Sequence, residues 1–177
     1  MKTSTTLGLI ALTIGGAQLQ AEDCFFNSCE AGVRIGFDAE STVSLNSYEF
    51  FGTINSPWSW ELNDSITADL NFEVALGALT GEGETAGYIR FAPALEISFG
   101  DFPVSIVMSS GPSLYSEDTF DQYDMGGNFH FTSSLGLEWR MCENWSISYR
   151  FQHTSNADIN DPNPGLEMHT VGLTWKY

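Results

Sequence analysis

Residues 145–155 have the sequence WSISYRFQHTS, and this stretch decides the fold. Its odd-numbered positions are apolar or aromatic from Trp145 to Phe151 and end in His153 and Ser155, whereas every even-numbered position is polar. Successive side chains of a β-strand point to opposite faces, so the pattern predicts a strand with one apolar and one polar face. Residues 169–177 repeat the pattern at the end of the chain.

Six more segments alternate in the same way: 33–39, 43–55, 66–78, 89–99, 102–108 and 129–139, with 43–55 the weakest. Eight strands of about ten residues, separated by turn-forming segments, predict an all-β chain that forms an eight-stranded antiparallel transmembrane β-barrel. Alternation alone does not say which face points inward, and a soluble barrel or sandwich would place the apolar face inside. The proline-free last strand ends in Trp175 and Tyr177, which favours the membrane barrel and resembles the assembly signal of outer-membrane proteins.

The polar faces of these predicted strands carry nearly all the strand charges. They hold all four arginines and five acids: Arg34, Arg90, Arg140, Arg150, Asp38, Asp69, Glu73, Glu96 and Glu138. In a barrel surrounded by lipid this face lines the lumen, which eight strands leave only wide enough for side chains to fill. Buried charges must pair, so we expect an ion-pair network in the lumen and no pore.

The start of the chain predicts export. Residues 1–21 combine Lys2 with an apolar core, LGLIALTIGGA, that is too short to cross a bilayer as a helix, which is typical of a signal peptide cleaved after Ala21. Residues 22–177 then form the barrel domain. The whole chain has a net charge of −17, and losing Lys2 makes it −18, which argues against nucleic-acid binding. Cys24 and Cys29 are close enough in sequence for a disulfide with Cys142 left free, although other pairings stay open.

An even number of strands places both termini at the periplasmic end of the barrel. The connections 81–87, 110–127 and 156–165 then face the cell surface, while 99–103 and 140–145 form short inner turns. Residues 56–58 predict the first inner turn, with Trp58 and Trp60 in the aromatic belt at the membrane interface.

Three residues near the outer edge of the apolar face have the chemistry of a catalytic triad. If the last hairpin pairs His153 with Glu167, Ser155 lies opposite Gly165, where the glycine leaves room for an acyl group. Directly opposed residues have Cβ atoms ~5 Å apart, so Glu167 reaches the imidazole. Acid, base and nucleophile then stand in the order that acyl transfer needs, at the depth of an ester linkage in an outer-leaflet lipid. The alternative is that all three are ordinary interface residues.

The sequence YRFQHTSNADINDPNPGLEM at 149–168, followed by VGLTWKY at 171–177, resembles the signature of the PagL-type lipid A 3-O-deacylases, outer-membrane enzymes with an eight-stranded barrel. The resemblance is close over about the last thirty residues and otherwise extends only to the barrel layout. It implies that Ser155 is the nucleophile, His153 the general base and Glu167 the acid that orients the base.

The same resemblance implies oxyanion contact or loop support for Asn156 and Asn163. Family members often have glycine where this chain has Asp158, which leaves the geometry of an oxyanion-binding N–H at that position in question.

The implied activity is removal of the ester-linked 3-hydroxyacyl chain from the 3-position of lipid A, or of lipopolysaccharide, in the outer leaflet of the outer membrane. Serine esterase chemistry of this kind requires no metal and no organic cofactor. The resemblance also implies a homodimer. Two other functions stay open: a structural or adhesive barrel with a decayed site, and a soluble lipid-binding barrel.

Overall fold

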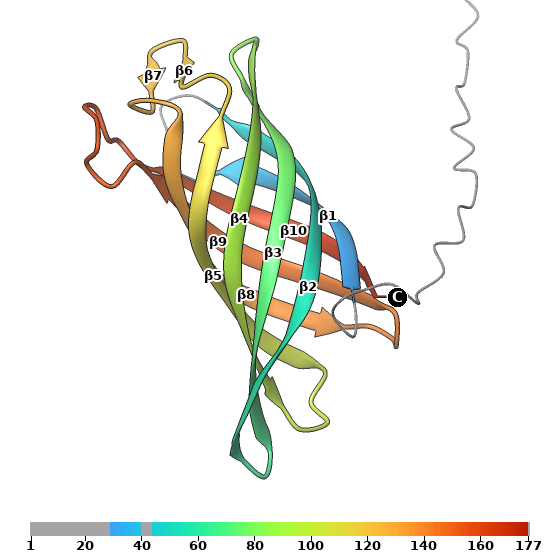
Figure 1. Cartoon of the computed structure of the whole chain (residues 1–177). Coiled ribbons are helices and arrows are strands. Elements are labelled where there is room, and N and C mark those ends of the chain that lie inside the picture. The colour runs from blue at the N-terminus through green and yellow to red at the C-terminus, as the bar shows by residue number, and fades with distance from the viewer. Residues whose placement is uncertain (1–28, 40–43, 177) are drawn as a thin grey trace, which may run out of the picture.

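The computed structural model describes residues 29–39 and 44–176 (Figure 1). Eight long strands close into one antiparallel barrel in the order β1-β10-β9-β8-β5-β4-β3-β2, which confirms the predicted fold class. The strands are β1 Cys29–Asp38, β2 Asn46–Asn63, β3 Ile66–Gly81, β4 Glu84–Phe99, β5 Val104–Tyr115, β8 Phe129–Arg140, β9 Trp145–Ser155 and β10 Leu166–Lys176. Between β5 and β8, β6 (Thr119–Phe120) and β7 (Tyr123–Asp124) form a small separate hairpin. Within the described residues, no helix is long and apolar enough to span a bilayer.

The apolar face of the strands is the outer wall of the barrel. On β9 the side chains of Trp145, Ile147, Tyr149 and Phe151 are exposed, and the even-numbered positions from Ser148 to Thr154 are buried in the lumen. The other strands expose large hydrophobic residues in the same manner. A soluble lipid-binding barrel would have the opposite arrangement, with its apolar face inside. The structure therefore shows which strand face points outward: the apolar one, so that the outer wall is suited to contact with lipid.

An ion-pair network fills the middle of the lumen, as predicted. Arg34, Arg90 and Arg150 converge on Glu73, with N–O distances of 3.0, 2.7 and 3.1 Å, and Glu73 is only 1% exposed. Glu49 accepts hydrogen bonds from Arg34 and, at 3.1 Å, from Arg90. Three guanidinium groups and two carboxylates therefore neutralise most of one another's charge, which is the condition for burying them.

A polar cavity of about 830 Å³ lies in the lumen at the end of the barrel where Glu30 pairs with Lys176. We call this the terminal end, because both described ends of the chain lie there (Figure 1). Four predicted lumen residues outside the central network line this cavity: Asp69, Glu96, Glu138 and Arg140. They face the lumen as expected. The fifth, Asp38, lies at the other end of β1, where it pairs with Met168.

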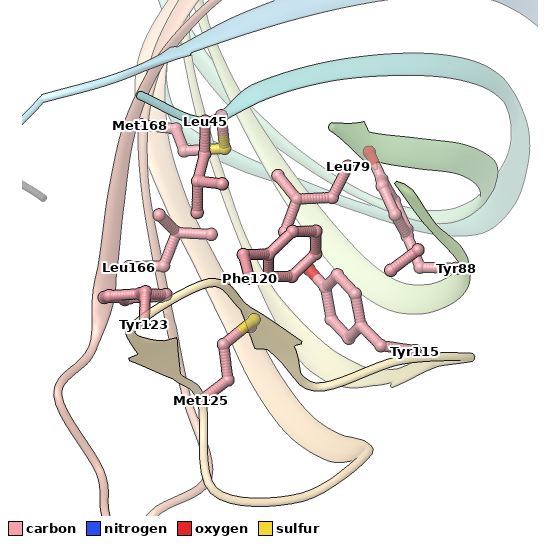
Figure 2. Packing of buried hydrophobic residues seen from close by; sticks show 10 residues of the cluster. Leu45, Leu79, Tyr88, Tyr115, Phe120, Tyr123, Met125, Leu166 and Met168 are labelled. Carbon is pink, nitrogen blue, oxygen red and sulfur yellow. The ribbon is translucent and has the colours of Figure 1, made fainter. Parts of the chain in front are cut away.

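A hydrophobic plug closes the lumen at the opposite end. Phe120 and Met125, from the segment that carries β6 and β7, pack among strand residues that point into the barrel (Figure 2). The remaining members of the cluster are Leu45, Leu79, Ala86, Tyr88, Tyr115, Tyr123, Leu166 and Met168. The plug fixes the β6–β7 segment over the barrel mouth, beside the start of β10.

Three predicted connections were wrong in their extent. The residues at 81–87 are not a long loop: β3 and β4 are joined by a tight turn at Glu82 and Gly83, both with positive φ, so the flanking residues join the strands. Residues 56–58 are not a turn, because β2 continues through a register shift to Asn63 and carries Trp58 and Trp60 exposed on its surface. The first third of 110–127 belongs to β5, which ends at Tyr115, rather than to a loop.

The predicted signal peptide, residues 1–21, lies outside the described residues, as do the side chains of the predicted Cys24–Cys29 disulfide. Cys142 is described: it is exposed and free, in the turn between β8 and β9 at the terminal end.

Candidate active site

The final hairpin brings His153 and Glu167 together on the outer wall. The two residues are direct partners in the β9–β10 ladder, as the predicted register requires. His153 Nδ1 lies 2.8 Å from Glu167 Oε1, with the histidine side chain 47% exposed and the glutamate 27% exposed. The bond occupies Nδ1 and fixes the ring, so Nε2 is the nitrogen left for proton transfer.

Ser155 ends β9 two residues beyond His153, which places it on the same face about 6.8 Å away at Cα. It lines a narrow crevice, too small to hold a water molecule, together with Thr154, Asn163, Gly165 and residues of the β6–β7 segment. The structure therefore brings all three residues of the predicted triad to one edge of the outer wall, at the end of the barrel away from the chain ends.

Gly165 has a different place from the one expected. Pairing of β10 with β9 begins one residue later, at Leu166 and Thr154, so Gly165 is not part of the ladder opposite Ser155. Its φ of +74° is left-handed, and a Cβ added there would lie 3.1 Å from His153 Cε1. The glycine thus leaves room for the imidazole rather than for an acyl group, because its open side faces His153.

Asn156 holds the loop after β9 in place. The residue is fully buried, and its Nδ2 lies within hydrogen-bonding distance of four carbonyl oxygens, those of Met125, Gly126, Asn160 and Pro162. Its backbone N–H donates to Asn163 Oδ1 at 3.0 Å. With these donors engaged, the geometry favours loop support over oxyanion contact for the Asn156 side chain.

Asp158 adopts the backbone conformation that glycine would make easy. Its φ is +60°, and Ala157 before it has φ of +55°. Aspartate tolerates the left-handed region better than most residues. Its Oδ1 also accepts a hydrogen bond of 2.9 Å from Asn163 Nδ2, which ties the two sides of the loop together. The departure from the family pattern therefore leaves this turn intact.

A family model described as lipid A 3-O-deacylase (PagL) matches residues 30–176. The chain belongs to this family. The match includes every described strand residue except Cys29, so membership in the deacylase family no longer depends on the terminal motif alone.

One relative in the family is the lipid A deacylase PagL of Bordetella bronchiseptica, which is 36% identical over 67 residues. That alignment covers 38% of this chain and spans about a third, 36%, of the relative's length. The crystal structure of the outer membrane enzyme PagL superposes with a TM-score of 0.71 at 18% identity, covering 82% of this chain and 97% of that one. A designed transmembrane β-barrel reaches 0.57 at 10% identity, covering 86% and 97%. These structural matches support the barrel fold.

Sequence reasoning missed one residue beside the site. Tyr123, from β7, lines the same crevice as Ser155, and its hydroxyl donates a hydrogen bond to the carbonyl oxygen of Gly165. The sequence placed its segment, 110–127, only in a connection at the cell surface. The signal that could have shown otherwise is the apolar set Phe120, Tyr123 and Met125 among the acids, which is too hydrophobic for a segment in water.

His130 lies on the buried face of β8 and points into the lumen. It is 1% exposed, and its Nε2 lies 2.6 Å from the carbonyl oxygen of Gly127. Among the described residues, no group of three or more His, Cys, Asp or Glu side chains is arranged to hold a metal ion.

Proposed function

We propose that this chain is an outer-membrane serine esterase that removes the ester-linked 3-hydroxyacyl chain from the 3-position of lipid A. The observation that carries the proposal is the hydrogen bond between His153 and Glu167 on the outer wall. His153 is two residues before Ser155 on the same face of β9. A water-soluble substrate would reach this wall poorly. A lipid of the outer leaflet, with its ester linkages just below the headgroup, would meet it directly.

In the proposed reaction, Ser155 Oγ attacks the ester carbonyl carbon while His153 Nε2 takes the serine proton. The C–O bond to the glucosamine 3-oxygen then breaks, and His153 returns the proton to that oxygen. Water attacks the resulting acyl-enzyme, again with His153 as base, and releases the 3-hydroxy fatty acid. Glu167 holds the imidazole in one tautomer and stabilises its protonated form.

The tetrahedral intermediate needs a hydrogen-bond donor at its oxyanion, and each such donor contributes about 3 kcal/mol. Asn163 is the best-placed side chain, because it lines the crevice with Ser155. Its amide Nδ2 carries two N–H groups, of which the bond to Asp158 uses one. We assign Asn163 to the oxyanion and Asn156 to support of the loop that carries it.

The test is mass spectrometry of lipid A after lipopolysaccharide is incubated with the purified, folded barrel in detergent. Loss of one 3-hydroxyacyl chain, and its appearance as free fatty acid, is the expected result. Ser155→Ala should abolish that loss while the variant still migrates as a folded barrel on an unheated gel. Unchanged lipid A with folded wild-type protein would favour the alternative, a non-catalytic structural barrel.

The resemblance also leads us to propose a homodimer. Chemical crosslinking across a range of protein-to-detergent ratios should then yield a two-chain product. A single-chain species at every ratio would contradict the dimer without bearing on the esterase activity.

A further inference from the structure

Two serines interrupt the apolar outer wall beside the active site. Ser110 of β5 and Ser133 of β8 are both exposed on this wall, with their hydroxyl oxygens 2.8 Å apart. Their neighbours along the outer faces of the two strands are mostly large: Met108, Pro112, Leu114, Phe129, Phe131, Leu135 and Leu137. The small serine side chains therefore leave a polar notch in a surface that otherwise suits hydrocarbon.

The notch is level with the catalytic pair. Ser110 is the ladder partner of Ser133, Ser133 is the partner of His153, and His153 is the partner of Glu167. Four polar side chains thus form one row across β5, β8, β9 and β10. Directly opposed residues have Cβ atoms about 5 Å apart, so the Ser133 hydroxyl borders the imidazole on the side away from Glu167.

The wall is also irregular at the far side of the notch. The β4–β5 ladder is interrupted between the pairs Arg90–Ser113 and Ala94–Ser109, and Ser110 lies within that gap. The gap contains Pro93 and Pro112, which have no N–H to donate to a ladder. Gaps of this kind weaken a sheet, so their position next to two outward hydroxyls suggests a place shaped for something other than strand pairing.

The hydroxyl pair keeps hydrogen-bonding capacity for a third group. Two serines have two O–H donors, and the bond between them uses one. An O–H that faces hydrocarbon without an acceptor costs free energy, and a polar group in the substrate would relieve that cost.

We propose that Ser133, supported by Ser110, binds the hydroxyl at the third carbon of the acyl chain and so selects 3-hydroxyacyl esters. Ser133 lies two residues closer to the terminal end than the ladder partner of Ser155, and hence on the acyl side of the ester rather than the sugar side. The diagonal from Ser155 to Ser133 is about 7–8 Å, and somewhat less between the Cβ atoms. Within that distance, Ser155 Oγ can contact the ester carbonyl carbon while Ser133 hydrogen-bonds to the hydroxyl two carbons further along the acyl chain. The assignment rests on the proposed deacylase function.

The test compares two substrates that differ in one group: glucosamine esterified at the 3-position with a 3-hydroxyacyl chain, or with the unsubstituted chain of equal length. The ratio of the two kcat/KM values reports hydroxyl recognition separately from overall activity. Wild-type protein should prefer the hydroxylated ester by about fivefold, the size of one typical net hydrogen bond. Ser133→Ala should bring the ratio close to one, and Ser133→Thr, which keeps the hydroxyl, should retain most of it.

The chain supplies a matched control on the other side of the wall. Ser109 and Ser134 form a hydroxyl pair with the same 2.8 Å separation, but both are buried in the lumen. Ser134→Ala should leave the substrate ratio at the wild-type value. A Ser133→Ala ratio equal to that of wild type, with deacylation intact, would overturn the subsite alone. Release of no acid from either ester by the folded wild-type protein would overturn the deacylase function and the subsite with it.

Discussion

Gly165→Ala is the most direct test of how the imidazole is positioned. The new methyl carbon would lie 3.1 Å from His153 Cε1, closer than ordinary carbon contacts, so the ring must move by a few tenths of an ångström. Alanine at φ of +74° also carries a backbone cost of about 1–2 kcal/mol. Because a displacement of about 1 Å at a reacting group can cost 10²-fold in rate, we expect kcat to fall about 10- to 100-fold.

Gly83→Ala separates the two effects. Gly83 has φ of +87°, so alanine meets a similar backbone cost, but no atom lies within 4 Å of the added carbon. Urea unfolding in detergent micelles, followed by tryptophan fluorescence, should show a similar loss of stability for both variants. Fatty-acid release, measured on samples that are fully folded, should fall only for Gly165→Ala. Full activity in Gly165→Ala, or an equal loss in both variants, would refute the role assigned to Gly165.

Three further changes test other parts of the structure. Glu167→Gln keeps the shape of the side chain but no longer stabilises protonated His153, so the rate of fatty-acid release should fall by up to about 10⁴-fold with folding unchanged. Near-normal release would show that Glu167 has no role in the mechanism. Tyr123→Phe loses the hydrogen bond to the Gly165 carbonyl. Because one net hydrogen bond contributes about 1 kcal/mol, we expect kcat to fall roughly fivefold. An unaltered kcat would mean that the β6–β7 segment does not position the site. Glu73→Ala leaves Glu49 to pair with Arg34 and Arg90 and removes the ion pair of Arg150, so it should lower the free energy of unfolding by about 3–5 kcal/mol in the micelle titration. A change below about 1 kcal/mol would show that the network adds little to stability.

Alternation predicted the barrel because lipid and lumen impose opposite chemistry on neighbouring residues. The pairing of His153 with Glu167 followed from the same pattern, since a shift of one residue would have turned Arg150 toward lipid. Strand ends were harder to predict. Gly111 and Pro112 resemble a turn in sequence, yet they lie within β5, where the neighbouring ladder is interrupted and no N–H is needed from the proline.

The long-range contacts around the site could not be predicted from the local sequence pattern. Tyr123 reaches Gly165 across 42 positions of sequence, and Asn156 contacts Met125 and Gly126 from about 30 positions away. Such contacts depend on how the β6–β7 segment folds back over the barrel mouth, and no periodicity in the chain encodes that path. The pairing of His153 with Glu167 was predictable because β9 and β10 are adjacent, whereas the partners of Tyr123 and Asn156 were not, because those contacts join a distant connection to this hairpin.

The inner and outer faces of the barrel wall have different roles: the inner face carries the ion-pair network, and the outer face carries the proposed site. Inside, Arg34, Arg90 and Arg150 share the carboxylates of Glu49 and Glu73, so this network fills the middle of the lumen, and the polar cavity at the terminal end lies away from His153 and Ser155. The proposed chemistry lies outside, where an exposed side chain such as His153 would be free to rotate without further contacts. The bond to Glu167, the glycine against the ring and the anchored loop supply the restraint that a lipid-exposed residue lacks. The proposed site on the outer wall thus depends on these three restraints rather than on enclosure in the lumen.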